Sequence, residues 1–185
     1  MATRCRLLGA SLLSAGVLAA VPATASAELA HQQINLETEG RNRIDSIGGF
    51  RPFEETLGDA IERFGEVTDV SRPLSEICEV SWGQHGVTIE FLNLSGFDDP
   101  CDPELRAHTA YITGRGWHTA RDLYITSQQS TMERLYREQR RSARRYSLVR
   151  GYRPFGDGGN LDILSVGLTD NRVSSFRMYI GAAGE

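Results

Sequence analysis

Apolar residues between positions 57 and 64 recur at the spacing of one helical face. They fall at i, i+3, i+4 and i+7, and they are Leu57, Ala60, Ile61 and Phe64. Thr56 and Asp59 match a capping box in which aspartate replaces the usual glutamate, and Gly65 suits the C-terminal cap. The pattern therefore predicts a short helix over residues 57–64.

Apolar and polar residues alternate in the segment that follows. The alternation runs through residues 79–82 and 87–91, on either side of the turn sequence GQHG. It predicts an antiparallel hairpin with one wet face, in which Trp82 belongs to the core. A third strand is predicted over residues 107–114, which read AHTAYITG.

The second half of the chain shows the same order of patterns. Ser130 and Glu133 match a capping box, and the apolar residues that follow predict a helix over residues 132–145. Strands are predicted over three segments, which are 144–152, 160–168 and 173–181. The sequence TDNR between the last two is expected to form a turn.

This shared order predicts an α+β fold of two tandem repeats, residues 47–114 and 115–185, packed as one body. Each repeat would be a short helix followed by about three antiparallel strands. The helix-to-last-strand distances agree, at 47 residues from Phe64 to Tyr111 and 43 from Tyr136 to Tyr179. The register stays open, since an offset of 75 residues aligns the helices and one near 67 aligns the last strands. The alternative is two unrelated stretches.

The N-terminal residues have the composition of a secretory signal peptide. Two arginines precede an apolar run over residues 7–21, and a small-x-small sequence, ASA, follows. The run is too short to span a bilayer. We therefore expect a signal peptide over residues 1–27 and a secreted or extracytoplasmic chain that begins near Glu28 and has no transmembrane segment. Residues 28–46 are expected to form a polar N-terminal arm.

Signal cleavage would leave two cysteines, Cys78 and Cys101. An even number of cysteines in an exported chain predicts a disulfide. The loop of about 24 residues that it closes corresponds to roughly 3 kcal/mol of stabilisation. A redox pair and half of a metal site are the alternatives, but the spacing is far from C-x-x-C and no histidine lies at ligand spacing.

Charge is distributed unevenly along the chain. Residues 28–104 hold 17 acidic residues and five arginines, whereas residues 105–185 hold 13 arginines and seven acidic residues. On the predicted helix 132–145, the arginines fall on one side. The candidate binding residues are Arg134, Arg137, Arg141, Arg144 and Arg145. This surface would bind lipid headgroups, a cell-wall polymer or an acidic protein; alternatively it is a solvated face that the acidic half neutralises. Nucleic acid is not expected as a partner.

Recognisable catalytic chemistry is missing from the sequence. It contains no G-x-S-x-G, no H-E-x-x-H and no phosphate-binding loop, and it predicts no cofactor and no metal. His85, in a turn, is expected to be solvated. The acidic disulfide loop offers Asp98, Asp99 and Glu104 as candidates for carboxylate-based hydrolysis, or for calcium, although the spacing is not that of an EF-hand.

Several motifs resemble those of a group of uncharacterised exported proteins of high-G+C bacteria. These motifs are GGFRPFEETLGDAIERFG, CEVSW, GVTIEF, DPCDPE, RGWHTARDLYIT and the terminal IGAAGE, and the resemblance covers residues 47–185. The helix-then-strands order resembles, in architecture, the β-lactamase inhibitor protein and the SmpA/OmlA outer-membrane assembly lipoproteins. The chain differs from both, because it lacks a lipoprotein cysteine and has Gln128 and Gln129 where an apolar helix residue is expected. The resemblance supplies no activity and no functional residues.

Together these observations predict an exported, non-catalytic binding or inhibitory module of the cell envelope or extracellular medium. Its partner would be a protein or an anionic envelope polymer. The alternative is a secreted hydrolase that uses carboxylates.

Overall fold

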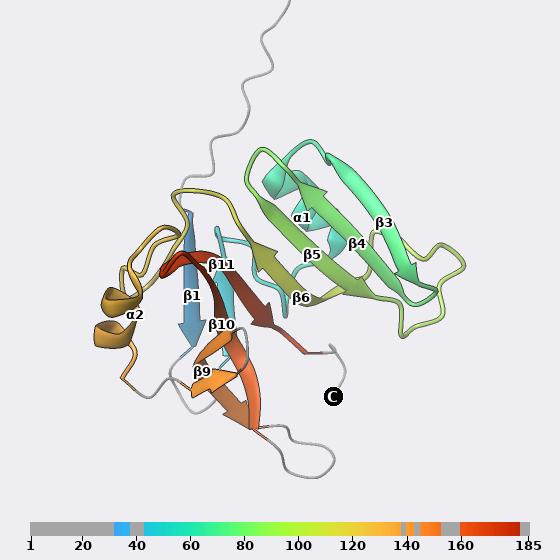
Figure 1. Ribbon diagram of the computed structural model, residues 1–185. Coiled ribbons are helices and arrows are strands. Elements are labelled where there is room, and N and C mark those ends of the chain that lie inside the picture. The colour runs from blue at the N-terminus through green and yellow to red at the C-terminus, as the bar shows by residue number, and fades with distance from the viewer. Residues whose placement is uncertain (1–31, 38–42, 138–139, 143–144, 153–159, 182–185) are drawn as a thin grey trace, which may run out of the picture.

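The computed structural model describes residues 32–37, 43–137, 140–142, 145–152 and 160–181. Within them it contains two helices and eleven strands. The strands form one sheet of eight and one of three (Figure 1). The helices are α1 (Leu57–Phe64) and α2 (Gln129–Leu135). The large sheet has the order β3-β4-β5-β6-β11-β10-β9-β8, and every described pairing in it is antiparallel.

In spatial order, the strands of the large sheet are β3 (Asp69–Leu74), β4 (Ile77–Trp82), β5 (Val87–Leu92), β6 (Arg106–Ile112), β11 (Arg172–Tyr179), β10 (Asn160–Thr169), β9 (Arg145–Tyr152) and β8 (Arg140–Ser142). The hairpin and the third strand predicted for the first half are confirmed as β4, β5 and β6. The segments predicted over 144–152, 160–168 and 173–181 are confirmed as β9, β10 and β11.

Helix α1 and the β4–β5 hairpin form the core of the first half. The predicted capping box at Thr56 and Asp59 is present, and the helix ends before Gly65, which has φ 80°. Phe64 packs against Trp82, with ring centroids 5.0 Å apart, and Trp82 donates its indole N–H to the Gly65 carbonyl. The local signals thus place the helix over the predicted residues.

Residues 83–86 bring the hairpin turn against the end of β6. Gly86 has φ 61°, and a Cβ there would lie 2.3 Å from the backbone nitrogen of Gly114. Only glycine fits such a close approach. His85 next to it is buried; its ring Nε2 lies 3.0 Å from the Phe64 carbonyl oxygen, and its own carbonyl accepts the Trp117 indole N–H. The expectation that His85 is solvated was wrong.

The small sheet consists of β2 (Arg43–Ile47), β1 (Gln33–Glu37) and β7 (His118–Thr119) in that order. β1 pairs antiparallel with β2 and parallel with β7. Ile34, Ile44 and Ile47 are fully buried in the common core. Part of the segment expected to be a polar arm, residues 28–46, is therefore built into the fold, because a few isoleucines suffice to anchor it. The predicted signal peptide, residues 1–27, lies outside the described residues.

The predicted α+β fold of two helix-plus-strand repeats is wrong, because the described fold is mostly β. β6 and β11 pair directly, with Tyr111 opposite Arg177, so the strands of both halves belong to one continuous sheet. α1 packs on the β4–β5 end, whereas α2 contacts β11 and is tied to β7 through the hydrogen bond of Tyr136 to Thr119. The similar order of elements in the two halves does not correspond to two similar bodies.

The predicted helix over residues 132–145 is also wrong, since α2 spans Gln129–Leu135 and residues 140–142 and 145–152 are strands. The N-cap is Gln128, without a side-chain hydrogen bond, so the predicted Ser130–Glu133 capping box is not formed. A longer helix would place like charges at i and i+4, as in Arg137 and Arg141, which is unfavourable. In the extended conformation the segment that forms β9 gains pairing with β10.

None of the helices in the described part of the chain has the length and apolarity needed to cross a membrane.

Candidate functional site

The structure separates the arginines that were expected to share one helical side. Arg134 lies in the last turn of α2, and Arg137 follows that helix. Arg141 belongs to β8 and Arg145 to β9, while Arg144 lies outside the described residues. The single helical face on which these arginines were predicted to lie is therefore not formed.

Two carboxylates of the disulfide loop, those of Asp99 and Asp102, accept hydrogen bonds from the backbone of the loop itself. Cys78 and Cys101 form the predicted disulfide, with Cα atoms 5.1 Å apart. Asp99 accepts hydrogen bonds from the Cys101 backbone N–H at 2.9 Å and from the Arg72 guanidinium at 3.2 Å. Glu104 lines a small pocket beside Phe97, but neither Asp98 nor Asp99 lines it. The three candidate hydrolytic carboxylates thus do not converge on one pocket.

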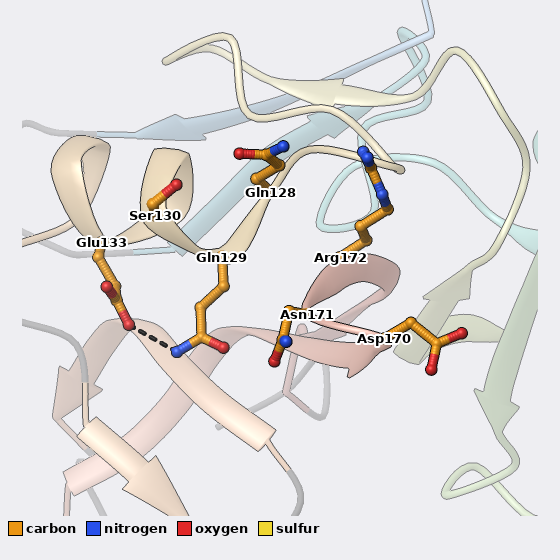
Figure 2. Close-up of a pocket in the computed structure, with 7 residues that line it drawn as sticks. All are labelled: Gln128, Gln129, Ser130, Glu133, Asp170, Asn171 and Arg172. Carbon is orange, nitrogen blue, oxygen red and sulfur yellow. Dashed lines mark hydrogen bonds between the residues drawn. The ribbon is translucent and has the colours of Figure 1, made fainter.

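A larger polar groove lies where the start of α2 meets the β10–β11 turn (Figure 2). Its volume is about 370 Å³. The side chains that line it come from two segments, residues 128–133 and 170–172, and they are Gln128, Gln129, Ser130, Glu133, Asp170, Asn171 and Arg172. This groove is the candidate functional site.

The turn that forms one wall follows from its sequence. Asp170 and Asn171 adopt left-handed backbone conformations, with φ 51° and 57°. Asp and Asn tolerate this conformation better than other non-glycine residues, and two such residues in a row suit a tight hairpin between twisted strands. The predicted TDNR turn is confirmed, and it projects Asp170 and Asn171 beside the groove (Figure 2).

Backbone hydrogen bonds hold the two walls together. The Gln129 N–H donates to the Asn171 carbonyl at 2.8 Å, and the Val173 N–H donates to the Ser127 carbonyl at 2.8 Å. Gln128 and Arg172 face each other as an isolated antiparallel bridge. The relative position of the walls is therefore set by main-chain atoms and does not depend on the lining side chains.

Thr126, at the edge of this junction, has an unusual backbone conformation. Its φ is 83°, a region that β-branched residues rarely occupy and that is unfavourable without support. The support is visible: the Thr126 N–H donates to the Val173 carbonyl at 2.7 Å, and its carbonyl accepts from Arg172 Nη1 at 3.0 Å. Such residues cluster at functional sites. The contact also fixes the Arg172 guanidinium at the groove.

The lining side chains differ in whether they already form hydrogen bonds within the protein. Gln129 donates through Nε2 to the Glu133 carboxylate at 2.7 Å and to the Tyr146 hydroxyl at 3.1 Å. Glu133 and Asp170 lie at opposite ends of the lining, and the groove wall provides a single hydroxyl, that of Ser130 (Figure 2). The described lining contains no histidine or cysteine. The lining side chains offer both hydrogen-bond donors and hydrogen-bond acceptors to a ligand in the groove.

Tyr136 anchors the other end of α2 in the core. Its hydroxyl donates to the Thr119 hydroxyl at 2.8 Å, and its ring lies under the Arg121 guanidinium. Burial raises the pKa of the Tyr136 hydroxyl, which therefore stays protonated and donating near neutral pH. This contact ties α2 to β7 and so positions the first turn of the helix at the groove.

Sequence reasoning missed the groove because its residues are ordinary polar residues on separate segments. The available signal was the pair Gln128 and Gln129, which occupies a place where an apolar helix residue was expected. The structure shows Gln128 exposed and Gln129 partly exposed along the groove.

Comparisons with known proteins give one weak structural similarity. No family model matches the chain, and no curated protein matches it. A solved structure described as an extracellular protein containing a SCP domain, from Bacillus anthracis str. Ames, is similar at 10% sequence identity with a TM-score of 0.39. The match covers 67% of this chain and 42% of that one, so this chain aligns with less than half of that protein. At this TM-score the similarity carries no argument about fold or function.

Proposed function

We propose that the protein is an exported, non-catalytic binding module whose groove holds an uncharged saccharide segment rich in hydroxyl and acetamido groups. The observation that carries this proposal is the groove lining, in which every side chain is polar and the two walls are joined by backbone hydrogen bonds. A preformed site of this kind loses little conformational entropy when a ligand binds.

The side-chain chemistry favours a neutral ligand. The amides of Gln128 and Asn171 can each donate and accept, as sugar hydroxyls require. Glu133 and Asp170 together outnumber the one cation of the lining, Arg172, so the groove does not favour the anionic polymer that the arginine pattern suggested. Its volume of about 370 Å³ lies in the range of small-molecule sites.

Binding without hydrolysis is favoured by the placement of the carboxylates. Glycoside hydrolysis uses two carboxyl groups that flank one bond, about 5–9.5 Å apart. Glu133 and Asp170 lie at opposite ends of the lining (Figure 2), and the Glu133 carboxylate already accepts a hydrogen bond from Gln129 at 2.7 Å. The candidate carboxylates of the disulfide loop do not converge either, since Glu104 lines a small pocket that Asp98 and Asp99 do not line, and Asp99 accepts the Cys101 backbone N–H.

Action outside the cytoplasm is supported by two observations of different kinds. The Cys78–Cys101 disulfide is typical of oxidising compartments. The N-terminal sequence has the three parts of a secretory signal.

Isothermal titration calorimetry of the mature chain tests the proposal. The ligands are the tetramer of N-acetylglucosamine, cellotetraose and, as an anionic comparison, tetragalacturonate. The neutral oligosaccharides should bind, with the acetamido sugar tighter. Asn171→Gly should weaken binding at least tenfold, because it removes the side chain and keeps the left-handed backbone. Asp122→Gly is the matched control, since Asp122 also has a left-handed φ, 57°, but lies outside the groove.

Three results would contradict the proposal. The first is that titration with either neutral oligosaccharide gives no heat of binding. The second is that the Asn171→Gly and Asp122→Gly variants bind the oligosaccharides with equal affinity. The third is that mass spectrometry detects cleavage of a bound oligosaccharide. The last result would restore the enzymatic alternative.

A further inference from the structure

An exposed aromatic side chain lies on the segment that leads into the groove. Tyr124 is 42% exposed. The Ser127 N–H donates to the Tyr124 carbonyl at 3.0 Å, and the Tyr124 N–H donates to the Ser127 hydroxyl at 3.0 Å. Ser127 directly precedes Gln128, the first residue of the groove lining. Tyr124 is therefore separated from the groove wall by a single tight turn.

The core holds the main chain on both sides of Tyr124. Leu123 and Ile125 are buried in the common core, while Tyr124 between them is exposed. The Ile125 N–H also donates to the Trp117 carbonyl at 2.9 Å. The position of Tyr124 is thus fixed by its neighbours, and its own side chain contributes no buried residue to the core.

His118 holds the Tyr124 ring in one orientation. The two rings are stacked, with centroids 4.6 Å apart and planes inclined by 21°. Their backbones face each other in an isolated antiparallel bridge, and His118 belongs to β7. The stack covers one side of the phenol ring, yet the residue stays largely accessible. An aromatic ring that is fixed in advance loses little rotamer entropy when a ligand packs against it.

The turn between Tyr124 and Ser127 has an unfavourable backbone conformation. Thr126 occupies its third position with φ 83°, where glycine is the usual residue. The support for this conformation comes from the groove, since Arg172 of the lining donates to the Thr126 carbonyl at 3.0 Å. Backbone strain of this kind points to a functional site. Here the strained turn keeps the Tyr124 ring in a fixed position relative to the groove.

We propose that Tyr124 is a stacking platform that extends the groove, and that the complete site binds a chain of β-linked pyranose rings of the gluco configuration. This inference rests on the proposed function, because it assigns a second contact to the same saccharide. The substituents of such rings are equatorial, so their axial C–H groups form apolar faces that pack on an aromatic ring. Every side chain of the groove lining is polar, and Tyr124 supplies the apolar contact that the lining lacks.

Substitutions at Tyr124 test the platform by isothermal titration calorimetry with the tetramer of N-acetylglucosamine and with cellotetraose. Tyr124→Ala should weaken binding of both ligands about tenfold, because one aromatic contact contributes on that order. The factor should be the same for the two ligands, since both present the same ring face. Tyr124→Phe keeps the ring and should bind like the wild type.

Two further variants serve as controls. Phe97→Ala removes another exposed aromatic side chain, 38% exposed, that lies outside the groove, and this variant should bind like the wild type. Tyr124→Leu keeps an apolar side chain without a ring and should bind as weakly as Tyr124→Ala, so a folding defect of the alanine variant does not decide the result. Circular dichroism and thermal unfolding establish that each variant is folded before it is titrated.

Failure of the platform is distinguishable from failure of the proposed function. If the wild type binds neither oligosaccharide, the proposed function is wrong and the platform with it. If Asn171→Gly weakens binding while the folded Tyr124 variants bind like the wild type, the groove stands and the platform is wrong. Stacking is also overturned if Tyr124→Phe loses as much affinity as Tyr124→Ala, or if only the acetamido ligand is affected.

Discussion

The two helices pack against different parts of the molecule, α1 against the β4–β5 hairpin and α2 beside the β10–β11 turn, and they are held in different ways. α1 has a complete capping box at Thr56, a glycine at its C-terminus and three buried residues on one face, Leu57, Ala60 and Phe64. α2 has no side-chain cap, and Met132 is its one buried residue. Its first turn is fixed by the Asn171 carbonyl and by the Gln129 side chain, and Tyr136 anchors its end.

The difference shows where stability and binding reside. α1 is specified by its own sequence and packs beside the loop that carries the disulfide. α2 depends on contacts with distant strands, and the groove lies at the place where those contacts are made. Binding residues commonly lie on loops that a rigid scaffold holds in position.

Removing the side chain of Phe64 should have the largest effect on stability. Phe64 is 1% exposed and contacts the rings of Phe50 and Trp82. Phe64→Ala should lower the free energy of unfolding by about 3–5 kcal/mol, because it leaves a cavity in the core. Ile61→Ala on the exposed side of α1 is the control and should change it by less than about 0.5 kcal/mol. Urea denaturation measures both, and similar losses in the two variants would refute this account of α1.

Loss of the disulfide should come next. Replacing Cys78 and Cys101 together by alanine should cost roughly 3 kcal/mol, since the closed loop spans 23 residues of sequence separation. The midpoint of urea unfolding should fall, and dithiothreitol should lower the wild-type midpoint in the same direction. An unchanged midpoint in both measurements would mean that the bond contributes nothing to this end of the sheet.

The N-cap residues of the two helices should differ in how much they contribute to stability, and this difference is smaller than the effects above. Thr56→Ala should destabilise the protein by about 1 kcal/mol, because the Asp59 backbone N–H loses its acceptor. Gln128→Ala at the N-cap of α2 should change stability by less than about 0.3 kcal/mol, since no side-chain cap bond is lost there. Equal effects in the two variants would remove the distinction between the helices.

The pH dependence of the first cap should give the smallest effect. Hydrogen bonds from the Thr56 backbone and side chain lower the pKa of the Asp59 carboxyl below its ordinary value of 3.8. A lowered folded-state pKa means that the stabilisation is present above the unfolded pKa and is lost as the pH falls through the folded one. The stability difference between wild type and Asp59→Asn should therefore shrink below about pH 4. A difference that is constant from pH 7 down to pH 2 would contradict the assignment.

Most strands could be predicted from the sequence, because alternation and turn residues are local signals. The positions of α1, the β4–β5 hairpin and β9 to β11 follow from such signals. α2 could not be predicted, since its apolar spacing suggested a helix to residue 145 and only the pairing of β9 with β10 decides otherwise. β3 was missed because its side chains do not alternate in burial.

The candidate site was harder to predict than the fold. The disulfide followed from counting cysteines, but the arginine surface depended on a helix that does not form. The groove joins residues 128–133 to residues 170–172, and no periodicity links segments that far apart. The parallel pairing of β1 with β7 is a long-range contact of the same kind. Such contacts depend on the complete packing of the chain.

The most direct test of the groove is nuclear magnetic resonance of the ¹⁵N-labelled mature protein, titrated with the tetramer of N-acetylglucosamine. The account predicts saturable chemical-shift changes in the backbone amides of residues 128–130 and 170–172 and in the side-chain amides of Gln128 and Asn171. The amides of α1 and of the β4–β5 hairpin should stay unchanged and serve as the internal reference. Changes confined to that end of the sheet, or no saturable change anywhere, would contradict the assignment of the groove as the binding site.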